Sequence, residues 1–172
     1  MRNRIVTTAL ASTAAVAGLL GTATPASAAT YYDMTIRSAA TGMCLAPEGR
    51  TSEEGVAIIQ TYCNGDPYQR WDFVDLGSGV YQIRNAVTLK CMDVAGSNID
   101  GTAVVQWTCA SITNQRFEAK PKLPGYVTLK TRVAGTKTHC LDVPGEQPID
   151  GLAIIIWSCG GYAGQTFGVF SA

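Results

Sequence analysis

The chain has little histidine, no excess charge of either sign and, beyond its first residues, no long apolar run. His139 is its only histidine, and 13 basic residues stand against 13 acidic ones. Such a balance lacks the basic footprint of proteins that bind nucleic acids or anionic membranes. A membrane-spanning helix needs about 20 consecutive apolar residues, and no segment after residue 28 approaches that length. We therefore expect no nucleic-acid partner and no membrane span.

The first residues have the composition of an export signal. Arg2 and Arg4 precede the mostly apolar stretch IVTTALASTAAVAGLL, and Ala-Ser-Ala at 26–28 has the form of a signal-peptidase site. We predict a signal peptide at residues 1–28 that is cleaved from a secreted, extracellular protein. Its loss leaves 11 basic and 13 acidic residues in one domain, residues 29–172, which is long enough to bury its own core.

Six cysteines in an exported chain indicate three disulfides, because the extracellular compartment is oxidising. An internal repeat selects among the possible pairings, since the separations within successive cysteine pairs are 19, 18 and 19 residues. We therefore predict one disulfide in each repeat. The predicted pairs are Cys44–Cys63, Cys91–Cys109 and Cys140–Cys159.

The three copies of this repeat share landmarks besides their cysteines. Each copy has a glycine eight residues before its second cysteine and closes on a Gln-x-aromatic triplet. The glutamines are predicted to tie loops together, and the aromatic rings to fill the core. The copies span residues of about 31–78, 79–123 and 124–172. The glycines are Gly55, Gly101 and Gly151, and the triplets end in Trp71, Phe117 and Phe167.

The repeats are built from short strands and turns. Segments such as VYQIR alternate, AVVQWTC and AIIIWSC are rich in β-branched and aromatic residues, and Asp-Gly dipeptides mark hairpin turns. No stretch shows the capped periodicity of an α-helix. Propellers close with four or more blades, whereas this chain has three units. The prediction is an all-β fold, a β-trefoil of three pseudo-symmetric repeats, each with one internal disulfide.

Several of these motifs together resemble the ricin B-chain-type lectins and the family 13-type carbohydrate-binding modules. They are Cys-[Leu/Met]-Asp-Val, the Asp-Gly turn, the aromatic residue two positions before the second cysteine, and Gln-x-[Trp/Phe]. The resemblance covers residues 31–172. It implies a β-trefoil with up to three sugar pockets, one per repeat.

The middle repeat contains all three elements that a sugar pocket needs. A pyranose requires a carboxylate to accept from its hydroxyls, an aromatic plate under its C–H face, and amides that donate and accept. Asp93 is the candidate acceptor, Trp107 the plate and Asn114 the amide, with Gln115 beside it. All four match positions that the family uses to bind the sugar or to brace the pocket.

The outer repeats retain fewer of these residues. The third keeps Asp142 and Trp157 but has Gly164 in place of Asn114, which predicts a weaker site. The first lacks the acid, the plate and the amide, and is predicted to be scaffold only. Its substitutions are Ala46, Thr61 and Tyr68.

One position of the middle repeat departs from galactose-binding relatives, in which an amide commonly lies two residues before the plate. Val105 occupies that position here, and Gln106 follows it. Because side chains alternate along a strand, Gln106 is expected to point away from the face that carries Trp107. The loss of a polar partner bears on affinity and on the choice of sugar.

These observations predict a secreted carbohydrate-binding protein without catalytic activity, cofactor or metal. Nucleophilic hydrolysis needs a base, but His139 stands alone and no Gly-x-Ser-x-Gly motif is present. The expected partner is a galactoside- or xylan-like glycan, bound by a monomer. An alternative is a trefoil for protein contacts, such as a secreted protease inhibitor, with vestigial sugar pockets.

Overall fold

The computed structural model describes residues 30–133, 135 and 137–172, so the predicted signal peptide lies outside the described residues. Within them the fold consists of β-strands joined by loops and five short 3-10 turns. The strands are β1 (Tyr31–Ser38), β2 (Cys44–Pro47), β3 (Ile58–Thr61), β4 (Arg70–Asp75), β5 (Val80–Asn85), β6 (Cys91–Val94), β7 (Val104–Trp107), β8 (Phe117–Leu123), β9 (Tyr126–Thr131), β10 (His139–Asp142), β11 (Ile155–Ser158) and β12 (Phe167–Ser171). The 3-10 turns are η1 (Glu48–Arg50), η2 (Pro67–Gln69), η3 (Thr113–Gln115), η4 (Pro144–Glu146) and η5 (Ala163–Gln165).

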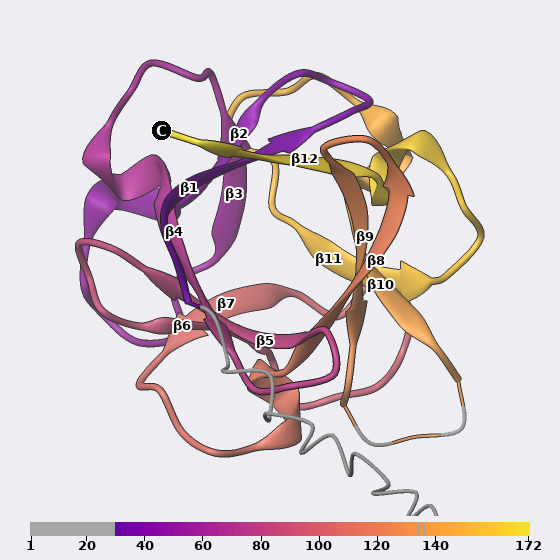
Figure 1. Cartoon of the computed structure of the whole chain (residues 1–172). Coiled ribbons are helices and arrows are strands. Elements are labelled where there is room, and N and C mark those ends of the chain that lie inside the picture. Colours follow the sequence, from indigo (N-terminus) through magenta and orange to yellow (C-terminus); the bar gives the residue numbers. More distant parts are fainter. Residues whose placement is uncertain (1–29, 134, 136) are drawn as a thin grey trace, which may run out of the picture.

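Six strands form a closed barrel at the centre of the molecule. β1 pairs with β4, β4 with β5, β5 with β8, β8 with β9, β9 with β12, and β12 returns to β1, always antiparallel. Each of these strands therefore has two neighbours, and the barrel leaves no open edge on which another chain could pair. Figure 1 shows the remaining strands arranged around this barrel.

The other six strands form three hairpins, β2–β3, β6–β7 and β10–β11. Isolated bridges join each hairpin to the other two: Ala57 to Val105, Ile59 to Ala153, and Ala103 to Ile155. Four successive strands thus make one unit, and three units close on each other as the threefold repeat predicts. The predicted all-β trefoil is confirmed.

The core lies inside the barrel and under the hairpins. The closing aromatic residues of the three repeats, Trp71, Phe117 and Phe167, are completely buried. Trp71 also satisfies its indole N–H, which donates to the Leu45 carbonyl at 3.0 Å. Burying a large apolar side chain contributes about 2–3 kcal/mol, so this aromatic triplet is a main source of stability. The predicted structural role of the rings is confirmed.

Each repeat contains one disulfide, as predicted. The bonds join Cys44 to Cys63, Cys91 to Cys109 and Cys140 to Cys159, with Cα–Cα distances of 5.1, 5.0 and 5.2 Å. Each bond links the first strand of a hairpin to the segment just after its second strand. In the second and third repeats the bond therefore holds the strand with the acid beside the strand with the aromatic plate.

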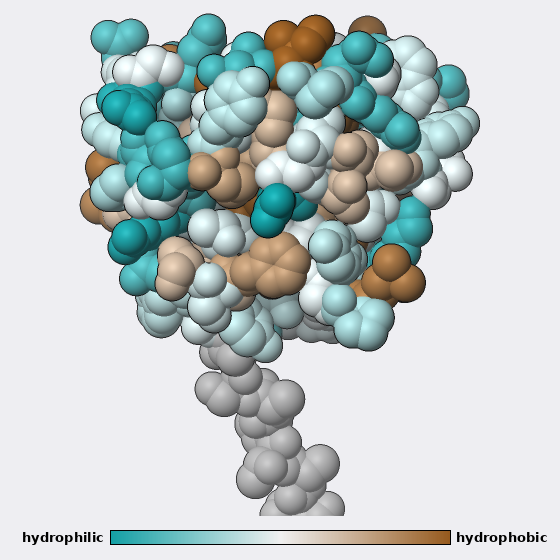
Figure 2. Space-filling view, turned by 90° about the horizontal axis from the view of Figure 1, so that it is seen from above, coloured by the Kyte–Doolittle hydropathy of each residue, from teal (hydrophilic) through white to brown (hydrophobic). Residues whose placement is uncertain are grey.

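The surface carries apolar side chains in small patches among polar ones, as Figure 2 shows for the face seen from above. The larger exposed apolar residues come from many different elements, among them Leu76, Ile99, Leu123 and Phe170. In the described part of the chain no helix has the length and apolarity to cross a membrane.

Candidate functional site

Asp93 and Trp107 lie on one face of the β6–β7 hairpin. Asp93 is opposite Val105, and Cys91 is opposite Trp107, so the two side chains are diagonal neighbours on the same face. Asp93 is only 8% exposed, whereas Trp107 is 46% exposed. A large aromatic residue left half-exposed beside a recessed acid is available to a ligand rather than committed to the core.

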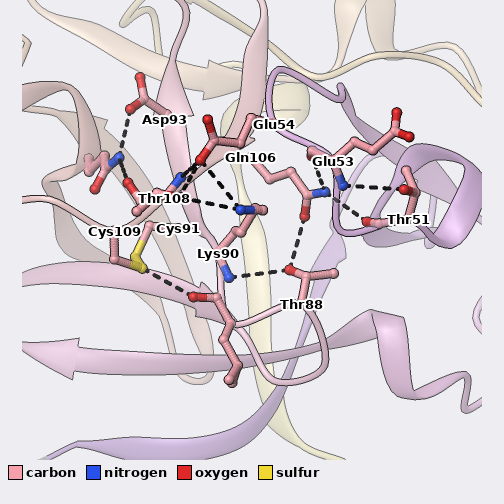
Figure 3. A network of polar contacts seen from close by, with 12 residues as sticks. Thr51, Glu53, Glu54, Thr88, Lys90, Cys91, Asp93, Gln106, Thr108 and Cys109 are labelled. Atoms are coloured by element: carbon pink, nitrogen blue, oxygen red, sulfur yellow. Dashed lines mark hydrogen bonds and ion pairs between the residues drawn. A yellow bond between two sulfur atoms is a disulfide. The ribbon is translucent and has the colours of Figure 1, made fainter.

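Gln115 braces the Asp93 carboxylate from η3. Its amide nitrogen donates to Asp93 Oδ2 at 2.8 Å and to the Thr108 carbonyl at 2.9 Å. Its amide oxygen accepts from the Ala110 N–H at 2.7 Å and from Gln82 Nε2 at 3.0 Å. This amide is fully used inside the protein, so Gln115 positions the acid. Figure 3 shows the bond to Asp93 within the surrounding network.

Burial changes the acidity of Asp93. Desolvation raises the pKa of its carboxyl above the usual range, and the hydrogen bond from Gln115 offsets part of that increase. Asn114, next to Gln115, donates from Nδ2 to the Val94 carbonyl at 3.0 Å. Asn114 therefore ties η3 to the end of β6, at the residue that follows the acid.

Gln106 and Val105 point to opposite sides of β7. Val105 shares the face of Trp107, whereas Gln106 is completely buried and reaches into the first repeat, as Figure 3 shows. Gln106 Nε2 donates to the carbonyls of Thr51 and Glu53 at 2.8 and 2.7 Å. The expected alternation is confirmed, and Gln106 holds a neighbouring loop.

That loop forms the support of Trp107. A Cβ placed on Gly55 would lie 3.4 Å from the Trp107 ring, so the backbone of the first repeat lies against the indole. The Glu54 carboxylate accepts hydrogen bonds from the Thr108 N–H at 3.2 Å and from the Thr108 hydroxyl. Lys90 Nζ also lies 3.4 Å from the same carboxylate. Residues of both the first and the second repeat therefore position Trp107. The motif positions alone do not show this contribution of the first repeat.

The third repeat repeats this arrangement with Asp142 and Trp157. Asp142 is opposite Ile155, and Cys140 is opposite Trp157. Asp142 is 8% exposed and Trp157 44% exposed. They border a cavity of about 410 Å³, which we call the third-repeat groove. It is lined by Asp142, Val143, Pro144, Gly145, Glu146, Ile155, Trp157 and Tyr162.

Glu146 and Tyr162 are polar lining residues that the motif positions did not indicate. Glu146 ends η4 and Tyr162 immediately precedes η5, outside the repeated positions of the acid, plate and amide. Only their places in the sequence could have indicated them: Glu146 lies four residues after the acid and Tyr162 three residues after the second cysteine.

Gly164 lacks the amide of Asn114, and its lack of a side chain also has a steric reason. A Cβ at this position would lie 2.9 Å from the Val143 carbonyl oxygen and 3.2 Å from Glu146 Cγ. The Gly164 N–H instead donates to Glu146 Oε1 at 3.0 Å. In the middle repeat the Asn114 side chain, from η3, bonds to the end of β6. In the third repeat the Glu146 side chain, from η4, instead bonds to the backbone of η5. Glu146 thus replaces Asn114 as the group that closes this end of the site.

The first repeat also contains a cavity, although it lacks the acid and the plate. A cavity of about 260 Å³ is lined in part by Ala46, Thr61 and Tyr68. Arg50 and Asp66 form an ion pair at its side, and Asp66 Oδ1 also accepts from the Tyr68 N–H at 2.9 Å. The prediction that this copy is scaffold only stays a prediction, but the cavity itself was not anticipated.

Comparisons with known proteins agree with the β-trefoil fold. Residues 23–107 match the family model described as ricin-type beta-trefoil lectin domain-like. Among solved structures, the designed threefold symmetric protein ThreeFoil is 28% identical, with a TM-score of 0.76 over 81% of this chain and 98% of its own.

Two natural proteins show the same likeness. An exo-beta-1,3-galactanase from Clostridium thermocellum, 1,3Gal43A, is 25% identical over 82% of this chain and 30% of its own, with a TM-score of 0.76. A Macrolepiota procera ricin B-like lectin, solved with lactose, is 19% identical over 84% of this chain and 96% of its own, with a TM-score of 0.64, and shows the fold alone. No curated protein sequence matches the chain.

Proposed function

Because residues 23–107 match the model of the ricin-type β-trefoil lectin-like domain, we propose that the chain is a secreted carbohydrate-binding protein without catalytic activity. The observation that supports this proposal most directly is the pair of Asp93 and Trp107 on one face of a hairpin. The acid is recessed and braced, while the plate is half-exposed. This is the pairing that a sugar needs, with hydroxyls on one side and an apolar C–H face on the other.

In the proposed complex a sugar ring stacks on Trp107 and donates from its hydroxyls to Asp93. One carboxylate oxygen already accepts from Gln115, so the acid keeps its orientation before the ligand arrives. Preorganisation of this kind reduces the ordering cost of binding. The backbone at Gly55 supports the indole from the first repeat. The middle repeat is therefore the proposed principal site for neutral sugars, and the third-repeat groove a second site.

The side chains opposite the acids limit affinity. Val105 faces Asp93 and Ile155 faces Asp142 across the hairpins, so neither acid has an amide as its cross-strand neighbour. A sugar hydroxyl directed toward these positions meets an apolar group. We expect an affinity per site near the millimolar range, about −4 kcal/mol, for a galactoside- or xylan-like glycan. Binding to several sites on one polymer would increase the overall affinity.

The test is retention of the mature protein on immobilised galactosides and xylan, combined with tryptophan fluorescence titration. Asp93→Ala and Trp107→Ala should each abolish most neutral-glycan binding while the thermal unfolding transition remains cooperative. Tyr32→Ala is the matched control, because it removes an exposed aromatic residue outside the site. Unchanged binding in both site variants contradicts the assignment. If the wild type binds a protease or another protein and no glycan, the alternative of a protein-contact trefoil replaces the lectin proposal.

A further inference from the structure

The three repeats differ in charge at one equivalent loop position. The residue after the loop glycine is Arg50 in the first repeat, Ser97 in the second and Glu146 in the third. Arg50 is neutralised by an ion pair with Asp66. The third-repeat groove therefore combines Glu146 with the recessed Asp142. The middle site has Asp93 without a second unpaired acid, because Glu54 beside Trp107 forms an ion pair with Lys90.

The two carboxylates of the groove lie around Gly164. A Cβ at this glycine would lie 3.5 Å from Asp142 Oδ1 and 3.2 Å from Glu146 Cγ. Burial raises the pKa of Asp142, a hydrogen bond with Gln165 offsets part of that increase, and the negative charge of Glu146 adds a smaller one. Their shared contact at Gly164 places the two acidic side chains close together on one side of the groove.

No basic residue is among the groove-lining residues of the described structure. The Lys122 ammonium approaches Gly161, the residue before Tyr162. It donates to the Gly161 carbonyl at 2.7 Å and to the Thr166 hydroxyl at 2.9 Å, so two of its donors are used there. The negative charge of the groove thus has no cationic partner among the residues that line it. A metal ion is a poor candidate for that partner, because the described residues contain no cluster of three or more acidic, histidine or cysteine ligands.

Two aromatic rings complete the groove. Trp157 and Tyr162 both line it, and Tyr162 is 58% exposed. A Cβ on Gly160 would fall 2.2 Å from the Tyr162 ring, so the ring lies directly over the Gly160 backbone. Exposed aromatic faces accept both the C–H face of a sugar and a cation.

We propose that the third-repeat groove binds a glycan that contains an unacetylated, protonated amino sugar, such as a β-1,4-linked glucosamine oligomer. Carboxylates only accept hydrogen bonds, and an ammonium group supplies three donors and the missing positive charge. The aromatic rings hold the adjacent ring carbons. This inference rests on the proposed function, because it names the ligand class of one of the two proposed sites.

The experiment is isothermal titration of the mature protein with glucosamine oligomers and with cello-oligosaccharides of equal length. The two ligands differ by an ammonium in place of a hydroxyl group at the same ring position. Wild type should bind the glucosamine oligomers about tenfold more tightly, as expected for one charge-assisted hydrogen bond. Glu146→Gln should remove most of this preference, since an amide oxygen still accepts from Gly164 but carries no charge.

Matched variants separate this site from the rest of the protein. Asp150→Asn removes one negative charge from the same repeat outside the groove lining, and should leave the preference unchanged. Trp157→Ala should abolish binding of the glucosamine oligomers, whereas Trp107→Ala should spare it. A thermal melt checks that Glu146→Gln is folded.

Several results would overturn the inference. Equal affinity for the two oligomers, or an unchanged preference in Glu146→Gln, shows that the acids do not select an amine. Equally tight binding of an oligolysine peptide shows a general cation surface and no amino-sugar site. If neutral glycans still bind through Trp107 in any of these cases, the proposed lectin function stands and only this inference fails.

Discussion

Gln106→Ile tests whether a buried amide joins the first two repeats. Gln106 Nε2 donates to the carbonyls of Thr51 and Glu53, and its oxygen accepts from the Thr88 hydroxyl at 3.0 Å. The third repeat has Ile156 at the equivalent position, completely buried, so an isoleucine is compatible with the fold. The substitution therefore removes three hydrogen bonds with little change in packing.

The expected loss follows from the number of bonds. A hydrogen bond contributes about 1 kcal/mol net, and leaving its partner unpaired costs more when that partner is buried. Three bonds give a decrease of about 3 kcal/mol in the free energy of unfolding. For a domain of this size, that decrease lowers Tm by about 10 °C.

Chemical denaturation with the disulfides intact, together with a calorimetric scan, measures this loss. Gln147→Ile is the control, because the same substitution at an exposed position removes one local bond, to the Gly145 carbonyl. A loss under about 1 kcal/mol in Gln106→Ile would refute the reasoning. The loop that Gln106 holds also carries Gly55, so neutral-glycan binding at Trp107 should weaken in the same variant.

Two further substitutions test the outer and middle sites. Gly164→Asn should not restore the middle-repeat arrangement; its Cβ would meet the Val143 carbonyl at 2.9 Å, and equilibrium denaturation should show a loss of about 1–3 kcal/mol. Asp93→Asn should abolish glycan binding while leaving stability at pH 7 equal or higher. Burial raises the native pKa of Asp93, so stability falls as pH rises through the window above the usual value, and the substitution removes that penalty. Conversely, wild-type glycan affinity at the middle site should fall as pH drops through this raised pKa, and an unchanged affinity there counts against Asp93 as an acceptor.

Much of the fold was predictable because the residues that recur in each repeat are those that form the disulfides and the core. The cysteine spacing predicted the disulfides, and the closing aromatic residues predicted the core. Strand alternation also predicted that Gln106 points away from the face of Trp107, and in the structure that side of β7 is buried. These predictions succeeded because each depends on neighbours within one repeat, where sequence distance and spatial distance correspond.

The candidate site was only partly predictable. The motif positions of Asp93 and Trp107 placed acid and plate on the same hairpin face. The contribution of Gly55 and Glu54 to Trp107 could not be seen, because it crosses from one repeat to the next. The steric role of Gly164 could not be seen for a similar reason, since its lack of a side chain had to be compared with the space beside Val143.

By itself the sequence determined the number of repeats, their disulfides, the strands and the aromatic core, because these follow from local periodicity and from spacing that recurs three times. Tertiary structure alone decided which loop residues meet at each groove. Glu146 and Asp142, and Trp157 with Tyr162, belong to different loops and strands, and their shared cavity depends on how the chain closes around Gly164. The charge of each groove depends on which loop residues the fold brings together, so three copies of one scaffold can carry three different sites.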